Sequence, residues 1–336
     1  RWAEFLGSGF ALVAGDNPYS ATIDFINTAA SSNATDFGDL LAAANNFAAL
    51  GSSTRAVFAG GGTSSAVQNV IQYSTFASTG TLSDFGDLST TASTCSGSSS
   101  STRGIINLGY SGGYLNTIEY ITIGSTGNST DFGDLTVARA SESGASASPT
   151  RGTLSGGYTG SKSNVIDYIT IASAGNATDF GDLQTGRFDH AGFASPTRAV
   201  FAGGKNTPAS PAEQSSIEYV TIATTGNGTD FGDMTAATRG PSGAASNTRG
   251  LMASGSPGTN NIEFLTIATT GNTSRFGELT VARNEILAGG TSNNVRALWA
   301  GGSTSTVIDF VKIATEGNAN DFGDLSVARS NTAGVS

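Results

Sequence analysis

Two kinds of short hydrophobic segment alternate along the chain, separated by polar residues. The first is an apolar segment that an arginine opens and a glycine pair closes, as in residues 198–204, Arg-Ala-Val-Phe-Ala-Gly-Gly. The second, as in residues 164–172, carries β-branched and aromatic residues on both faces of an extended strand. No window has the periodicity of an amphipathic helix. The pattern therefore predicts short strands that are covered on both faces.

One five-residue motif, usually Asp-Phe-Gly-Asp-Leu, occurs seven times. Its copies begin at residues 36, 84, 131, 179, 230, 275 and 321, at intervals of 48, 47, 48, 51, 45 and 46 residues. These intervals are too long for leucine-rich, ankyrin or tetratricopeptide repeats and fall in the range of propeller blades. Three to four short strands in each unit predict a four-stranded antiparallel blade. The chain is therefore predicted to be an all-β, seven-bladed β-propeller.

The two ends of the chain complement each other. The first unit begins directly with the glycine-ended strand at residues 10–15, without the segment that precedes this strand in other units. Residues 326–336 supply such a segment with no strand after it. We therefore expect one C-terminal and three N-terminal strands to form one blade and close the ring, with residues 1–336 as a single propeller domain. Because the chain lacks an initiator Met and a signal peptide, we expect a processed product or part of a longer polypeptide.

The order of residues within a unit resembles the kelch repeat. A glycine pair ends one strand, an aromatic residue follows in the next strand, a second aromatic comes about a dozen residues later, and an arginine follows. In the fourth unit these residues are Gly156, Gly157, Tyr168, Phe180 and Arg187. Phe replaces the family's usual Trp, and the arginine is missing after Asp36 and Asp84. The resemblance covers nearly the whole chain and implies a kelch-like propeller.

The repeated Phe-Gly motif is interpreted as framework. We expect its Phe to pack between blades, its Gly to turn the chain tightly, and its Asp side chains to accept backbone hydrogen bonds or to pair with Arg. In the Thr-Gly-Asn segment before it, a turn with left-handed Asn and Gly is expected. Seven copies without a catalytic loop argue against a kinase magnesium motif, and the alternating ligands of a calcium loop are missing. No metal is expected. The framework residues are Asp36, Phe37, Asp84, Phe85, Asp131, Phe132, Asp179, Phe180, Asp230, Phe231, Phe276, Asp321 and Phe322.

A second set of acidic residues lies in the third strand of the units. An acid between two apolar strand residues, such as Asp167 between Ile166 and Tyr168, is costly if it is buried without a partner. We therefore predict arginine partners from the same or the next blade. The residues concerned are Asp24, Glu119, Asp167, Glu218, Glu263 and Asp309.

Length variation is concentrated in the loops between the glycine-ended strand and the aromatic strand. The distance from the strand-opening arginine to the next aromatic residue ranges from 14 to 21 residues, whereas the distance from that aromatic to the Phe-Gly motif is always 11. Because these loops emerge on one face of a propeller, that face is the candidate ligand site. Neutral drift of surface loops is the alternative. The longest loop spans residues 205–214, and the candidate ligand-binding residues are Tyr110, Tyr114, Tyr158, Lys205 and Asn206.

Composition limits the function further. The chain has 46 Gly, 12% charged residues, one His, one Cys and a net charge of −10. A single His and a single Cys cannot build a zinc site or a disulfide, and the negative charge disfavours nucleic acid. No apolar stretch approaches the roughly 20 residues that span a bilayer. His190 is interpreted as a local substitution rather than a catalytic base, and neither catalytic residues nor a cofactor are expected.

The amino-acid sequence of the repeat shows a second resemblance. Strings such as Thr-Ile-Ala-Thr-Thr-Gly-Asn-x-Thr-Asp-Phe-Gly-Asp-Leu-Thr-Val-Ala-Arg are similar to repeats in structural and tail-fibre proteins of marine cyanophages. The resemblance implies a non-enzymatic virion protein on a tail, fibre or capsid surface, which binds a host surface glycan or protein or serves in assembly with other virion proteins. The alternative is an extracellular carbohydrate-binding or adhesin propeller of a bacterium. Fold alone does not decide between them.

Overall fold

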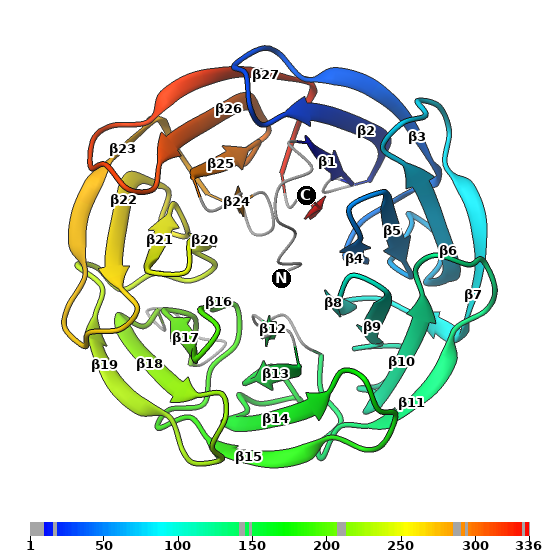
Figure 1. Cartoon of the computed structure of the whole chain (residues 1–336), viewed down its shortest axis with the longest axis horizontal. Helices are drawn as coiled ribbons and strands as arrows, with labels where there is room; N and C mark the ends of the chain where they lie inside the picture. Colours follow the sequence, from blue (N-terminus) through cyan, green and yellow to red (C-terminus); the bar gives the residue numbers. More distant parts are fainter. Residues whose placement is uncertain are drawn as a thin grey trace.

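Seven four-stranded antiparallel sheets surround a central axis (Figure 1). The computed structural model describes residues 10–15, 19–140, 145–147, 150–206, 213–284, 290–292, 295–330 and 333–335. Each sheet is one blade, with its first strand nearest the axis and its fourth strand at the rim. This arrangement confirms the predicted seven-bladed β-propeller. No membrane-crossing helix is found among the described residues.

The blades follow one another in chain order. In blades 2 to 7 the strands run in sequence from the axis outward, whereas in blade 1 the C-terminal strand β28 is innermost. Blade 1 contains β28 (Ala333–Val335), β1 (Phe10–Ala14), β2 (Ser20–Asn27) and β3 (Thr35–Ala44). Blade 2 contains β4 (Ala48–Gly51), β5 (Arg55–Ala59), β6 (Gln68–Thr75) and β7 (Ser83–Ala92). Blade 3 contains β8 (Ser96–Ser99), β9 (Arg103–Asn107), β10 (Thr117–Thr122) and β11 (Thr130–Asp134). Blade 4 contains β12 (Ala145–Ala147), β13 (Arg151–Ser155), β14 (Val165–Thr170) and β15 (Thr178–Asp182).

The remaining three blades have the same plan. Blade 5 contains β16 (Ala191–Ala194), β17 (Arg198–Ala202), β18 (Ser216–Thr221) and β19 (Thr229–Asp233). Blade 6 contains β20 (Ser242–Ala245), β21 (Arg249–Ala253), β22 (Thr259–Thr266) and β23 (Ser274–Arg283). Blade 7 contains β24 (Gly290–Ser292), β25 (Arg296–Ala300), β26 (Ser305–Lys312) and β27 (Asn320–Arg329).

The ring closes in blade 1, where the C-terminal strand β28 pairs with the N-terminal strand β1. In this antiparallel pair Leu12 lies opposite Val335, and Ala14 lies opposite Ala333. One C-terminal and three N-terminal strands therefore share this sheet, as the complementary ends of the sequence predict. Pairing of β28 with β1 leaves no free edge on the axial side of β1.

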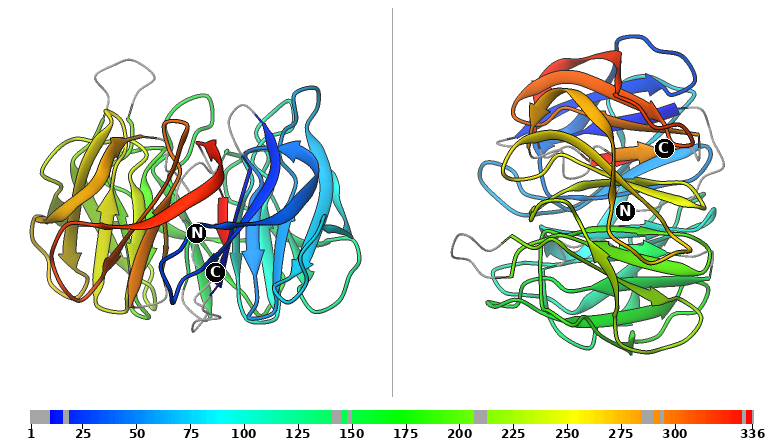
Figure 2. Two further views of the ribbon diagram at one scale, coloured as in Figure 1. Left: turned by 90° about the horizontal axis from the view of Figure 1, so that it is seen from above. Right: turned by 90° about the vertical axis from the view of Figure 1, so that its left-hand side faces the viewer.

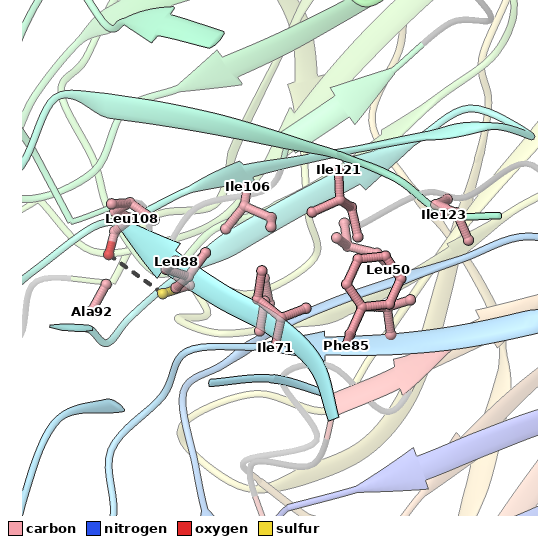
Figure 3. Close-up of a cluster of buried hydrophobic side chains, with 13 residues drawn as sticks. Leu50, Ile71, Phe85, Leu88, Ala92, Ile106, Leu108, Ile121 and Ile123 are labelled. Carbon is pink, nitrogen blue, oxygen red and sulfur yellow. Dashed lines mark hydrogen bonds between the residues drawn. The ribbon is translucent and has the colours of Figure 1, made fainter. Parts of the chain in front are cut away.

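The hydrophobic core consists of seven clusters, and each cluster lies between two adjacent blades. Between blades 2 and 3, Ile71 and Phe85 pack against Ile106 and Ile121 (Figure 3). Cys95 belongs to the same cluster, and its Sγ donates to the carbonyl oxygen of Leu108 at 3.4 Å. The motif Phe residues are all at most 4% exposed, as the framework interpretation predicts: Phe37, Phe85, Phe132, Phe180, Phe231, Phe276 and Phe322.

The Phe-Gly motif is a β-bulge within the fourth strand, and the expectation of a tight turn is wrong. In blade 3, Ile118 lies opposite Gly133 and Glu119 lies opposite Asp131, so Phe132 is the extra residue. The first Asp of the motif accepts the backbone N–H of the Gly, as Asp131 Oδ1 does from Gly133 at 3.0 Å. Corresponding contacts occur at Asp36, Asp84, Asp179, Asp230 and Asp321. These contacts confirm, for the first Asp of the motif, that the motif acids accept backbone hydrogen bonds.

Close contact between blades explains why this bulge contains Gly. The φ of Gly86 is 147°, a value that favours glycine, and an added Cβ would overlap the carbonyl group of Gly127 in the next blade. The N–H of Gly127 donates to the carbonyl oxygen of Phe85 at 2.7 Å. The adjacent Asn128 accepts the N–H of Asp87 through its Oδ1 at 3.1 Å. The expected left-handed conformation therefore occurs at Gly127. Asn128 instead joins its turn to the preceding blade through the hydrogen bond of its side chain.

The arginines at the start of the second strands also join adjacent blades. Arg55 lies over the ring of Tyr73 at 4.7 Å, and its Nη1 donates to the carbonyl oxygen of Ile123 in the next blade at 2.9 Å. Five further arginines repeat both contacts: Arg103, Arg151, Arg198, Arg249 and Arg296. In blade 1 the corresponding residue is Phe10, whose ring centroid lies 5.0 Å from that of Phe25.

The third-strand acids are all buried, but only four of the six have the predicted arginine. The ion pairs join adjacent blades: Arg139 with Asp167, Arg187 with Glu218, Arg283 with Asp309 and Arg329 with Asp24. Burial is the largest influence on the pKa of Arg139, Arg187 and Arg283, which it lowers, and on the pKa of Asp309, which it raises.

The arginine prediction is wrong for Glu119 and Glu263. No ion pair in the described part of the chain involves either carboxyl group. Glu119 instead accepts hydrogen bonds from the N–H and hydroxyl of Ser89 and from the hydroxyl of Ser129. Glu263 accepts from the N–H and hydroxyl of Thr235 and from the hydroxyl of Thr273. Hydroxyl and amide donors therefore replace the guanidinium at these two positions.

Candidate functional site

Loops emerge at two faces of the ring, as the side views show (Figure 2). Consecutive strands of a blade are antiparallel, so their connections alternate between the faces. We call the face with the loops between second and third strands the variable face. It also carries the connections from each fourth strand to the next blade. The candidate residues lie on this face, although residues 207–212 of the longest loop lie outside the described residues.

Two tyrosines lie opposite each other in the blade 3 loop of the variable face. Tyr110 and Tyr114 form an isolated antiparallel bridge. The turn between them is held by a hydrogen bond from Ser111 N–H to the carbonyl oxygen of Gly113 at 2.9 Å. Gly112, with a φ of 71°, supplies the left-handed residue that such a turn needs. The two ring centroids are 5.5 Å apart, in an edge-to-face arrangement.

The blade 4 loop has the same local structure and extends the aromatic surface. Tyr158 bridges to Lys162, and Thr159 N–H donates to the carbonyl oxygen of Ser161 at 2.9 Å. The Tyr158 ring lies 5.9 Å from that of Tyr114 and 5.1 Å from that of Phe188. Tyr110, Tyr114, Tyr158 and Phe188 therefore form one continuous line of rings, which we call the aromatic row.

Lys205 and Asn206 adjoin the far end of the row. Phe188 and Lys205 exchange two backbone hydrogen bonds, of 3.0 and 2.8 Å, which join the connection after blade 4 to the blade 5 loop. Asn206 is half-buried and directly precedes the undescribed residues 207–212. The structure therefore brings the three candidate tyrosines together and places Lys205 beside Phe188, the fourth ring of the row.

The exposure of the aromatic row suits contact with a ligand at the surface. Tyr110 is 37% exposed, Tyr114 and Tyr158 are half-buried, and Phe188 is almost buried. Tyrosine combines an apolar ring with a hydroxyl that can donate or accept, so such a row can cover an apolar surface and hydrogen-bond its polar edge. Lys162 is exposed beside Tyr158 and can add a donor with a positive charge.

Phe188 and Lys162 are the members of this site that sequence reasoning missed. Phe188 directly follows the framework arginine Arg187, at a position where other units have Ala140, Asn284 or Ser330. A bulky aromatic residue at this position departs from the repeat, and that departure is the signal that could have identified it.

His190 is part of the framework between blades 4 and 5. Its Nε2 lies 2.9 Å from the hydroxyl oxygen of Ser155, and its ring contacts Phe201 edge to face. Its Nδ1 has no hydrogen-bond partner among the described residues. Burial, with a smaller contribution from the nearby charge of Arg187, lowers the pKa of His190 to about 3. A histidine that stays neutral in this environment suits packing, which agrees with its interpretation as a local substitution.

The lowered pKa of His190 predicts a pH-dependent stability that His190→Phe should remove. The unfolded chain binds a proton near pH 6.5 and the folded chain only near pH 3, so this stabilisation is present above pH 6.5 and is lost as pH falls. The wild type should lose about 1.4 kcal/mol per pH unit relative to His190→Phe across this window. Phe is chosen because Phe47 occupies the corresponding position in blade 2.

Urea unfolding of both proteins at pH 7 and pH 4.5 measures this difference. Carboxyl groups titrate in both proteins, so their contribution cancels when the two free energies of unfolding are subtracted. A difference that stays constant between these pH values would contradict a neutral, buried His190.

These features define a closed seven-bladed β-propeller with an aromatic row on its variable face. Comparison with protein-family models finds no match, and comparison with curated proteins finds no significant relative. Within the described residues, no group of three or more His, Cys, Asp or Glu side chains is arranged to hold a metal ion.

Proposed function

We propose that the protein is a non-enzymatic, kelch-like propeller of a phage virion that binds a host surface glycan through its aromatic row. The continuous line of Tyr110, Tyr114, Tyr158 and Phe188 across two blades and into a third is the observation that carries this proposal. Sugar rings have apolar C–H faces and polar hydroxyl edges. Aromatic rings with hydroxyl groups at their tips match both parts of such a ligand.

The framework supports a binding role rather than catalysis. The first Asp of the motif accepts a backbone hydrogen bond, and the third-strand acids are buried in contacts between blades. The single histidine is buried between blades 4 and 5. These side chains, which could act as general acids or bases elsewhere, already make contacts within the framework. On the variable face, the aromatic row offers a ligand both apolar contact and hydrogen-bonding hydroxyl groups.

The virion setting rests on the resemblance of the repeat to cyanophage structural proteins. Low charge and a closed ring also suit a particle exposed outside the cell, where the propeller would contact other virion proteins at its base. An extracellular bacterial adhesin could use the same aromatic row. The two settings differ in where the chain is found and in which proteins surround it.

Imaging of purified particles tests the virion proposal. Particles in which mass spectrometry detects this chain should show, by cryo-electron microscopy, a seven-bladed ring on the tail, fibre or capsid surface. The face that carries Tyr110 and Tyr158 should point away from the particle. A chain found only in a bacterial envelope, or a variable face covered by other virion proteins, would contradict this proposal.

A further inference from the structure

Four of the seven contacts between adjacent blades contain a buried arginine. The groups around this arginine show which hydrogen-bond acceptors its guanidinium binds. At the contact between blades 4 and 5, Arg187 donates to the carbonyl oxygens of Gly203 at 3.1 Å and Ser216 at 2.8 Å. It also forms the ion pair with Glu218. The position therefore combines one carboxylate with main-chain carbonyl oxygens, an arrangement that suits a planar guanidinium with several donors.

Two of the three contacts without arginine compensate for its loss within the chain. Between blades 1 and 2, Ala44 takes the place of the arginine, and the facing acid is replaced by the neutral Gln72. Between blades 2 and 3, Ala92 takes the place of the arginine, and Leu108 packs in the same apolar cluster (Figure 3). In the first case the acid is absent. In the second case the acid Glu119 remains and accepts hydrogen bonds from Ser89 and Ser129, while the apolar side chain of Leu108 adds to the packing beside Ala92.

The contact between blades 5 and 6 also keeps its acid, Glu263, without an arginine, but here the smaller Ser254 takes the place of Leu108. Thr238 stands eight residues after Asp230, where Arg187 stands eight after Asp179, and the arginine is displaced by one residue to Arg239. Arg239 forms a backbone bridge with Ser256 on the variable face. The carboxyl group of Glu263 accepts hydrogen bonds from Thr235 and Thr273 but has no cation among the described residues, although the residue is only 5% exposed.

A cavity of about 180 Å³ lies at this contact. Thr238, Ser254, Asn261 and Glu263 line it, and its walls include the exposed residues 236, 237, 257 and 258. The cavity is smaller than the roughly 300 Å³ of a typical small-molecule pocket, so its size suits one functional group rather than a whole large ligand. The exposed residues in its wall give a ligand access from the variable face.

The lining residues correspond to the groups that bind Arg187 in the neighbouring contact. Ser254 corresponds to Gly203, Asn261 to Ser216, and Glu263 to Glu218. The carbonyl oxygen of Ser216 accepts both Gly203 N–H and Arg187 Nη1. Asn261 O accepts the corresponding N–H, that of Ser254, at 3.4 Å. The acceptors of a guanidinium site are therefore retained next to a cavity.

We propose that this cavity binds the guanidinium group of a ligand, which occupies the place of the missing arginine side chain. Glu263 supplies the charge, and the carbonyl oxygens of Ser254 and Asn261 supply the further acceptors. The guanidinium reaches the cavity from the variable face, either on a free small molecule or on an arginine side chain of a partner protein. This site is separate from the aromatic row, and it does not depend on the glycan proposal.

Binding of ethylguanidinium, compared with its neutral isostere ethylurea, tests the site in the unmodified protein. Titration followed by NMR should show saturable shifts at residues around Thr238 and Glu263 with ethylguanidinium and none with ethylurea. Glu263→Gln should weaken ethylguanidinium binding about 10-fold or more, because it removes the charge but keeps the shape. Thr238→Arg should abolish binding, because its own guanidinium fills the cavity, and should raise the Tm by about 2 °C or more.

Ala92→Arg is the matched control, because it adds an arginine at the corresponding position where Leu108 already packs. This variant should lower the Tm and leave ethylguanidinium binding unchanged. Free arginine and an arginine-containing peptide distinguish the two sources of the group: tighter binding of the peptide indicates a protein partner, and equal binding indicates a small molecule. Equal shifts with ethylurea, or full binding by both Glu263→Gln and Thr238→Arg, would overturn the proposal.

Discussion

Arg283→Met is expected to lower the free energy of unfolding by about 3–5 kcal/mol, the largest loss we expect from one side chain. Arg283 and Asp309 pair at 2.7 Å between blades 6 and 7, with 1% and 0% of their side chains exposed. Arg283 also donates to the carbonyl oxygens of Val307 at 2.9 Å and Trp299 at 3.1 Å. Removing the guanidinium leaves a buried carboxylate without a counter-ion and two carbonyl oxygens without this donor.

A double-mutant cycle separates the ion pair from simple loss of packing. Arg283→Met combined with Asp309→Asn should lose less stability than the sum of the two single variants, because no unpaired charge remains. Blades 1 and 2, which have Ala44 and Gln72 at the two corresponding positions, show that the ring accommodates neutral residues there. Urea unfolding of the four proteins at pH 7 measures the coupling. Additive losses would contradict the assignment of this ion pair as a stabilising contact between blades.

The pH dependence of Arg283→Met provides a second check. Burial already raises the pKa of Asp309 in the folded protein, and loss of Arg283 removes the charge that opposes this effect. A raised pKa means that the folded state binds the proton more readily than the unfolded state. The loss of unfolding free energy caused by Arg283→Met should therefore grow as the pH rises through that pKa. This loss should be smaller at pH 4.5 than at pH 7.

The number of blades and the closure of the ring were predictable because both depend on periodicity alone. Seven copies of one motif count the blades, and an incomplete first unit with a complementary C-terminal segment locates the closing blade. The bulge at Phe132 was not predictable in the same way. It depends on the register between β10 and β11, which the order of residues does not specify when a Phe-Gly pair suits either a turn or a bulge.

The partners of the buried acids show a different limit. The sequence places an acid in the third strand of six units, and burial of all six follows from their apolar neighbours. Whether the partner is arginine or a hydroxyl depends on a single position in the adjacent blade. Thr238 and Arg239 illustrate this sensitivity, because a shift of the arginine by one residue accompanies the loss of the ion pair at Glu263.

The candidate site was predicted in part for a similar reason. Loop length variation identified the variable face, and Tyr110, Tyr114 and Tyr158 lie on neighbouring loops in sequence order. Contact between Tyr158 and Phe188 joins a loop to the connection between two blades, where the N–H of Gly157 donates to the carbonyl oxygen of Arg187 at 2.9 Å. Sequence spacing therefore indicated the face, and the three-dimensional arrangement defined the row.

Tyr114→Ala is expected to weaken binding of a host surface glycan about 10-fold or more. Tyr114 is the ring that links Tyr110 to Tyr158, with centroid distances of 5.5 and 5.9 Å. Its removal takes away one aromatic contact and interrupts the row at its centre. Tyr19→Ala is the matched control: Tyr19 is 39% exposed, close to the 37% of Tyr110, and lies in the corresponding loop of blade 1, outside the row.

Binding of the wild type, Tyr114→Ala and Tyr19→Ala to an array of host surface glycans tests the central claim most directly. Equal Tm values for the three proteins would establish that each variant keeps its fold. We expect the wild type and Tyr19→Ala to bind the same glycans with equal affinity, and Tyr114→Ala to bind them about 10-fold or more weakly. Unchanged binding by Tyr114→Ala, equal loss in both variants, or no glycan bound by the wild type would contradict the aromatic row as the ligand site.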